Sequence, residues 1–70
     1  MTQIIEAKIT GNLIATLNAI ARIKGAKIAK ITETTYITVA IKCSKKNEDA
    51  VWAALEEVKG IEADSMLTVY

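Results

Sequence analysis

Few residues of this chain belong to the types that perform catalysis. The sequence has no histidine, the side chain that most often serves as a general base or metal ligand near neutral pH. Its single cysteine, Cys43, lies near Lys42, Lys45 and Lys46, and nearby positive charge favours a reactive thiolate. A cysteine that ends an apolar alternation is more often a buried core residue. One cysteine also excludes an intrachain disulfide and a paired-cysteine zinc site. Because the chain has no histidine to act as a base beside a serine or cysteine, we expect no enzymatic activity.

Carboxylates are the other groups with possible chemistry, and they concentrate in the last third of the chain. Clusters of carboxylate oxygens can hold a hard cation such as Ca²⁺ or Mg²⁺. The six acids here fall on predicted helix-surface and outer-strand positions, and no loop gives them the spacing of a ligand set. We therefore expect solvated carboxylates, with no metal and no cofactor, at Glu48, Asp49, Glu56, Glu57, Glu62 and Asp64.

Charge is segregated along the sequence although the net charge is only +1. Residues 1–46 hold eight Lys or Arg against two acids, whereas residues 47–70 hold one lysine against six acids. Two solvated helices of opposite sign would explain this division, and a basic binding patch or head-to-tail self-association are the alternatives. A domain this small buries only roughly 60% of its unfolded surface, which makes a homo-oligomer the expected supplement to its core.

Composition places the chain among globular domains. It is 51% apolar and 24% charged, far from the signature of disorder, so residues 1–70 are expected to form one domain. No stretch approaches the ~18 apolar residues that a membrane span needs, and the first six residues lack a basic region followed by an apolar run. A lone cysteine fits a reducing compartment. We expect a cytoplasmic protein without a membrane partner.

The first half of the sequence predicts a strand, a helix and a second strand. Alternation at Ile5, Ala7 and Ile9 is typical of a half-buried strand. Asn12 is the expected N-cap of a helix that runs to Gly25, a glycine suited to a left-handed C-cap. The β-branched segment 26–34 then predicts a strand with a bulge near Ala29-Lys30, because Ile28 and Ile31 are out of phase for a regular strand.

The second half predicts the same three elements. Residues 36–43 alternate and form a hairpin with the preceding strand. Asn47 is the expected N-cap of a second helix, whose first-turn acids suit the positive end of its dipole. After Gly60 the last strand is expected to place one row inward, Ile61, Ala63, Ser65, Leu67 and Val69, and the other outward, Glu62, Asp64, Met66, Thr68 and Tyr70.

The two halves repeat with a period of 35 residues. That shift places Ile20 on Leu55 and the tripeptide Ile23-Lys24-Gly25 on Val58-Lys59-Gly60. Two strand-helix-strand units joined by a hairpin are typical of the α+β ferredoxin-like β-α-β-β-α-β sandwich, with a four-stranded antiparallel sheet and two helices on one face. Lys27 and Lys30 would then lie on an edge strand and guard it against pairing.

The opposite face of this sheet would stay open and is the first candidate for a binding surface. Its predicted residues mix threonines, charges and aromatics, a pattern that fits either a solvated sheet or a surface for a peptide or protein partner. The candidate contact residues on it are Tyr36, Thr38, Lys42, Met66 and Tyr70.

The sequence lacks the characteristic motifs of three families that share this fold. Acylphosphatases use an arginine in the first strand-helix loop, and heavy-metal-binding domains use paired cysteines there, but this loop reads Thr10-Gly11-Asn12. RNA-recognition domains stack bases on aromatics of the central strands, where this chain offers only Tyr36. We therefore do not expect nucleic acid as a partner.

Two weaker resemblances suggest binding functions. The segment from Gly11-Asn12-Leu13 through a helix to Gly25 resembles amino-acid-sensing ACT domains, which implies a ligand near Gly11, Asn12 and Leu13 at a domain interface. The order of segments 14–19, 37–41 and 58–70 is similar to that of NapD-type chaperones, which implies binding of a twin-arginine signal peptide on the sheet. We rank peptide or protein binding first, amino-acid sensing second, and a structural or inhibitory protein acting through assembly third.

Overall fold

The computed structural model describes residues 2–69, which form four strands, two α-helices and one short 3₁₀ turn. In chain order these are β1 (Thr2–Ile9), α1 (Leu13–Ala21), β2 (Lys27–Glu33), β3 (Ile37–Ser44), the turn Lys45–Asn47, α2 (Glu48–Glu56) and β4 (Ile61–Val69). Among these residues no helix has the length and apolar character that crossing a membrane requires.

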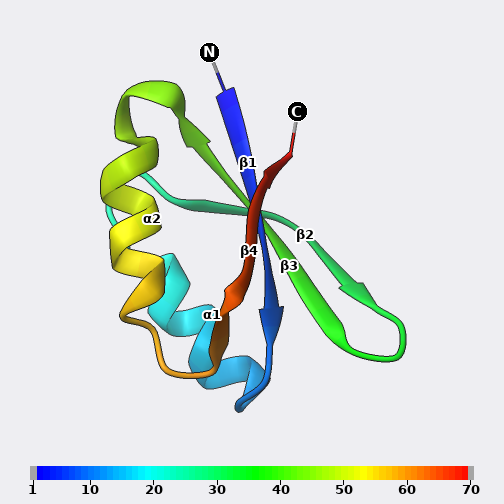
Figure 1. The fold of residues 1–70 in the computed structure, drawn as a ribbon. Coiled ribbons are helices and arrows are strands. Elements are labelled where there is room, and N and C mark those ends of the chain that lie inside the picture. Colours follow the sequence, from blue (N-terminus) through cyan, green and yellow to red (C-terminus); the bar gives the residue numbers. More distant parts are fainter. Residues whose placement is uncertain (1, 70) are drawn as a thin grey trace.

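The strands form one antiparallel sheet in the order β2-β3-β1-β4. Both helices pack on the same side of it, and the β2–β3 hairpin extends beyond them (Figure 1). This arrangement confirms the predicted ferredoxin-like α+β fold, with β1 and β3 at the centre and β2 and β4 at the edges.

The predicted 35-residue repeat is also present in the fold. Shifting the bounds of β1 by 35 gives those of β3, and the same shift carries α1 onto α2. The buried helix positions Thr16 and Ile20 fall on the buried Val51 and Leu55. The inward rows of the strands do not coincide, because β1 buries odd-numbered residues and so does β3 although 35 is odd.

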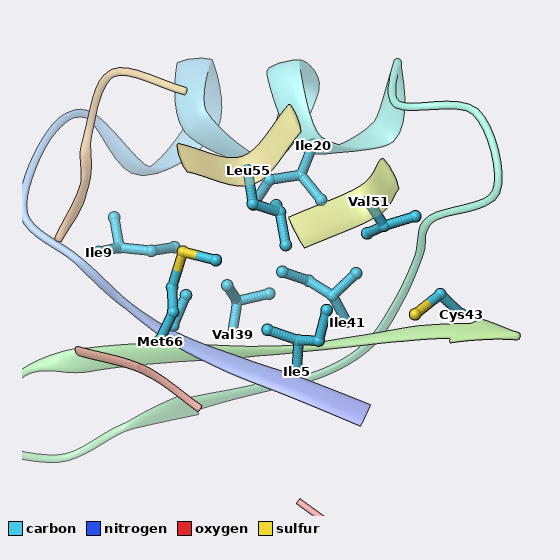
Figure 2. Packing of buried hydrophobic residues seen from close by; sticks show 10 residues of the cluster. Ile5, Ile9, Ile20, Val39, Ile41, Cys43, Val51, Leu55 and Met66 are labelled. Carbon is cyan, nitrogen blue, oxygen red and sulfur yellow. The ribbon is translucent and has the colours of Figure 1, made fainter. Parts of the chain in front are cut away.

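The core lies between the sheet and the helices. Ile20, Val51 and Leu55 point down from α1 and α2 onto Ile5, Val39 and Ile41 of the central strands (Figure 2). These side chains are fully buried. Each removes most of its apolar surface from water, which contributes about 1.5–3 kcal/mol per side chain before entropy is counted.

Both helices begin where the sequence indicates, but α1 ends at Ala21, with Arg22 as its C-cap, rather than running to Gly25 as predicted. The Asn12 side chain accepts a hydrogen bond from the backbone N–H of Ala15 at 2.9 Å and caps α1, as predicted. Asn47 occupies the N-cap position of α2 but makes no side-chain capping bond. Instead it packs against Gly25, where a Cβ would lie 3.1 Å from its Nδ2. Gly25 and its repeat equivalent Gly60 both adopt positive φ, +87° and +98°, in the turns that follow the C-caps Arg22 and Glu57.

Both edge strands are bulged. In β2 the register shifts between Ile28 and Lys30, which confirms the predicted bulge at Ala29. In β4 the shift is larger, because Glu62 pairs with Lys8 and Leu67 pairs with Glu6, so that residues 63–66 lie opposite Ala7 alone. The three additional residues reverse the phase of β4, since an odd insertion turns every later side chain to the other face.

This second bulge corrects the predicted faces of the last strand. Met66, expected on the open face, is 8% exposed and belongs to the core, where it packs beneath the helices (Figure 2). Leu67, expected inside, is 51% exposed. Thr68 pairs with the buried Ile5 and donates a hydrogen bond to Glu48 Oε2 at 3.0 Å, so it too lies on the helix side. Ser65, expected inside, lines the open face.

Candidate functional site on the open sheet face

The strand register defines three cross-strand rows on the face opposite the helices, because directly paired residues share one face of a sheet. One row runs from Thr32 across to Glu62 and contains both Thr38 and Lys8. The next two rows are Lys30, Ala40, Glu6 and Leu67, then Lys27, Lys42, Ile4 and Val69.

A shallow depression of about 220 Å³ lies at the middle of this face. Half-exposed Tyr36 and Leu67 stand on its wall, together with residues of β1, β3 and the β4 bulge. The full lining is Glu6, Ala7, Lys8, Tyr36, Thr38, Ser65 and Leu67. A hollow of this size accommodates one or two side chains of a partner rather than a whole cofactor.

Lys8 links Tyr36, which lines the depression, to Glu62 on the β4 edge of the open face. Its Nζ lies 4.6 Å from the centroid of the Tyr36 ring and 3.7 Å from Glu62 Oε2. The first contact is a cation–π interaction and the second an exposed ion pair, each of which contributes about 1 kcal/mol or less at such a surface. Together they orient the Tyr36 ring, and the backbone carbonyl of Tyr36 accepts a hydrogen bond from the backbone N–H of Thr34 at 3.0 Å.

The β4 bulge forms the other wall and depends on Ser65. The Ser65 hydroxyl accepts a hydrogen bond from the Lys8 N–H at 2.9 Å and donates one to the Glu62 carbonyl at 2.6 Å. These bonds replace ladder contacts that the bulge interrupts. The one polar residue in an otherwise apolar sequence row is therefore the residue that holds the bulge.

Two corners of the open face differ in chemistry. At the β2–β3 corner, Lys27 lies directly across from Lys42, with Lys30 in the next row. Within residues 2–69 none of these three lysines makes a salt bridge. The β1–β4 corner is apolar, with Ile4 paired to Val69 beside Leu67. An extended partner that crosses the sheet would therefore meet lysines at one end and apolar side chains at the other.

The predicted partner-binding residues separate into three groups. Tyr36 and Thr38 line the depression, and Lys42 lies on the same face at the lysine corner. Met66 lies in the core, and Tyr70 lies outside the described residues. Sequence reasoning missed Leu67 as a contact residue because it extended one alternation from Ile61 through Val69, although Ser65 and Met66 depart from it.

The loop nominated for an amino-acid ligand is tightly packed. The N–H groups of Thr10 and Gly11 both donate to the Gly60 carbonyl, at 2.7 and 3.2 Å. A Cβ on Gly11 would lie 2.7 Å from the Gly60 Cα, so the two loops are in direct backbone contact. Asn12 is committed to its capping bond, and Leu13 packs partly against the core. These groups are already engaged within the chain.

The other residues with possible chemistry lie elsewhere. Cys43 is buried at 4% exposure, and burial, assisted by the negative charge of Glu48, raises the pKa of its thiol. Glu48 itself accepts hydrogen bonds from Gln3 at 3.4 Å and Thr68 at 3.0 Å, which join β1 and β4 to the start of α2. Nowhere in residues 2–69 do three acidic or cysteine side chains gather as a metal-binding group.

Comparisons of the chain with models of known protein families, with curated proteins and with solved structures returned no match.

Proposed function

We propose that this chain is a non-catalytic binding module that recognises an extended peptide, or a segment of a protein, on the open face of its sheet. The observation that carries the proposal is the central depression, where Tyr36 and Leu67 are each 51% exposed. Large aromatic and aliphatic side chains of this kind are the usual anchors of protein interfaces.

Recognition on this face would depend on side chains. The backbone groups of the central strands β1 and β3 are hydrogen-bonded to the strands on either side, so a partner cannot add a strand there. A partner side chain would instead enter the depression between Tyr36 and Leu67. The oriented Tyr36 ring loses little further freedom on binding, which favours affinity.

The charges of the face bear on the choice of partner. Lys27, Lys30 and Lys42 are exposed and form no salt bridge with any residue from 2 to 69, which favours a partner with acidic residues at that corner. A dibasic segment of the kind that NapD-type chaperones bind would have to avoid that corner and reach Glu6 and Glu62 instead. An acidic and apolar peptide is therefore the better fit, and amino-acid sensing at the first loop ranks below it because the loop amides are already bonded.

The test is a selection of peptides from a displayed random library on the immobilised chain, followed by affinity measurements on variants. Tyr36→Ala and Leu67→Ala should each weaken the selected peptides about tenfold or more, because each removes an anchor worth roughly 1–2 kcal/mol. Ile14→Ala is the matched control, since Ile14 is 71% exposed on α1 at the other side of the molecule. Equal affinity for all three variants, or no selected peptide, would contradict the proposal.

A further inference from the structure

The two edge strands of the sheet are chemically complementary. Each has only one neighbour, β3 for β2 and β1 for β4, so each presents a row of backbone groups without a strand partner. Each also carries one large apolar side chain that stays exposed, Ile31 at 44% on β2 and Leu67 at 51% on β4. These are two of the four exposed large apolar residues of the described chain.

Charge distinguishes the edges although they are repeat equivalents. Residues 22–33, which end α1 and form β2, hold four basic residues against one acid. The equivalent residues 57–68, which end α2 and form β4, hold three acids against one lysine. The exposed pair Lys27 and Lys30 thus marks the basic edge, and the exposed pair Glu62 and Asp64 marks the acidic edge.

Strand direction makes the two edges compatible. β1 is antiparallel to both β3 and β4, and β2 is antiparallel to β3, so β2 and β4 run in opposite directions. A second copy placed beside the first in the same orientation would therefore set its β4 edge antiparallel to the β2 edge. Glu62 lies on the same open face as Lys30, one row away along the strands, so an offset of one row between the copies sets Glu62 across from Lys30.

We propose that copies of this chain associate head to tail, with the basic β2 edge of one copy against the acidic β4 edge of the next. Two β2 edges repel each other through their lysines, and two β4 edges through their acids, so charge selects the unlike pair. The contact is heterologous and joins different surfaces, which produces chains or closed rings rather than a dimer. It leaves Tyr36 and the central depression uncovered and does not depend on the proposed function, although Lys27 and Lys30 take part in both proposals.

Sedimentation velocity of the purified full chain, over a concentration series up to about 1 mM, tests this association. The mean mass should rise beyond that of a dimer, and added salt at roughly 1 M should reduce it by screening the charges. A chain that stays monomeric throughout, or a dimer that is insensitive to salt, would overturn the proposal.

Paired charge reversals give the sharper result. The double variant Lys27→Glu with Lys30→Glu has two acidic edges, and the double variant Glu62→Lys with Asp64→Lys has two basic edges. The affinity of self-association should fall at least about tenfold in each. A one-to-one mixture of the two should associate again, because each mutated edge then meets its complement. The control reverses Lys45 and Lys46 to Glu, the same charge change in the exposed turn outside both edges.

The outcomes separate cleanly. Restored association in the mixture, with the control variant unchanged, supports the edge contact. A mixture that stays dissociated although both variants remain folded by circular dichroism overturns it. Peptide binding by Tyr36 and Leu67 is measured on monomer at low concentration, so the two proposals fail independently.

Discussion

The first and second strand-helix-strand halves share their plan but differ in how their last strands meet the sheet. β2 inserts one residue at Ala29, whereas β4 inserts three residues opposite Ala7. The larger bulge places Met66 in the core and Leu67 on the open face. Only the second half therefore contributes Leu67 to the wall of the depression, and the difference shows how two similar sequences can place different side chains on the open face.

The equivalent glycines Gly25 and Gly60 should give the largest contrast between the halves. Gly60→Ala should lower the free energy of unfolding by about 3–4 kcal/mol, because the new Cβ would overlap the hydroxyl of the buried Thr16 at positive φ. Gly25→Ala should cost about 1 kcal/mol, since its neighbour Asn47 is exposed and can move. Urea denaturation measures both losses, and equal losses would mean that the Thr16 side chain moves away from the new Cβ at little cost.

The next largest effect concerns which residues of β4 face the core. Met66→Ala should destabilise the fold by about 2–4 kcal/mol through a core cavity, whereas Leu67→Ala should cost less than about 1 kcal/mol. A regular alternation along β4 requires the reverse order. Chemical denaturation of the two variants distinguishes the two arrangements, and a larger loss of unfolding free energy for Leu67→Ala would contradict the bulge.

The bulge itself can be weakened at Ser65. Ser65→Ala leaves the Lys8 N–H without its acceptor and should cost about 1–2 kcal/mol. Hydrogen exchange at the Lys8 amide should accelerate accordingly. Ser44→Ala is the control, because the Ser44 side chain makes no capping bond at the turn after β3 and should change stability by less than about 0.5 kcal/mol. Unchanged exchange at Lys8 would contradict the role of the hydroxyl.

The smallest effect concerns Cys43, which a shift of 35 equates with Lys8 on the opposite face of the sheet. Burial raises the pKa of the folded thiol, so above the unfolded value of about 8.5 the unfolded chain loses a proton that the folded chain keeps. Stability present at lower pH should then decline as the pH rises, by at most about 1.4 kcal/mol per unit. The measurement is the free energy of unfolding as a function of pH for the unchanged chain and for Cys43→Ala. Parallel curves for the two proteins would contradict the prediction.

Local patterns were sufficient for most of the fold. Alternation at Ile5, Ala7 and Ile9 and the Asn12 cap are properties of a few adjacent residues, and both predictions are confirmed, whereas α1 ends at Ala21 and not at Gly25. The bulge at Ala29 was also predictable, because Ile28 and Ile31 break the period of two. These features depend on short-range sterics and hydrogen bonds, which sequence spacing records directly.

The open face was decided by tertiary structure. The residues from Ile61 to Val69 fit one alternation except at Ser65 and Met66, and that local break does not by itself give the size of the bulge or the face of each later residue. The bulge arises because β4 must fit the register of β1 while Ser65 bonds to Lys8 and Glu62. Pairing between strands far apart in sequence thus determined which side of β4 faces the helices, and with it the place of Met66 and Leu67.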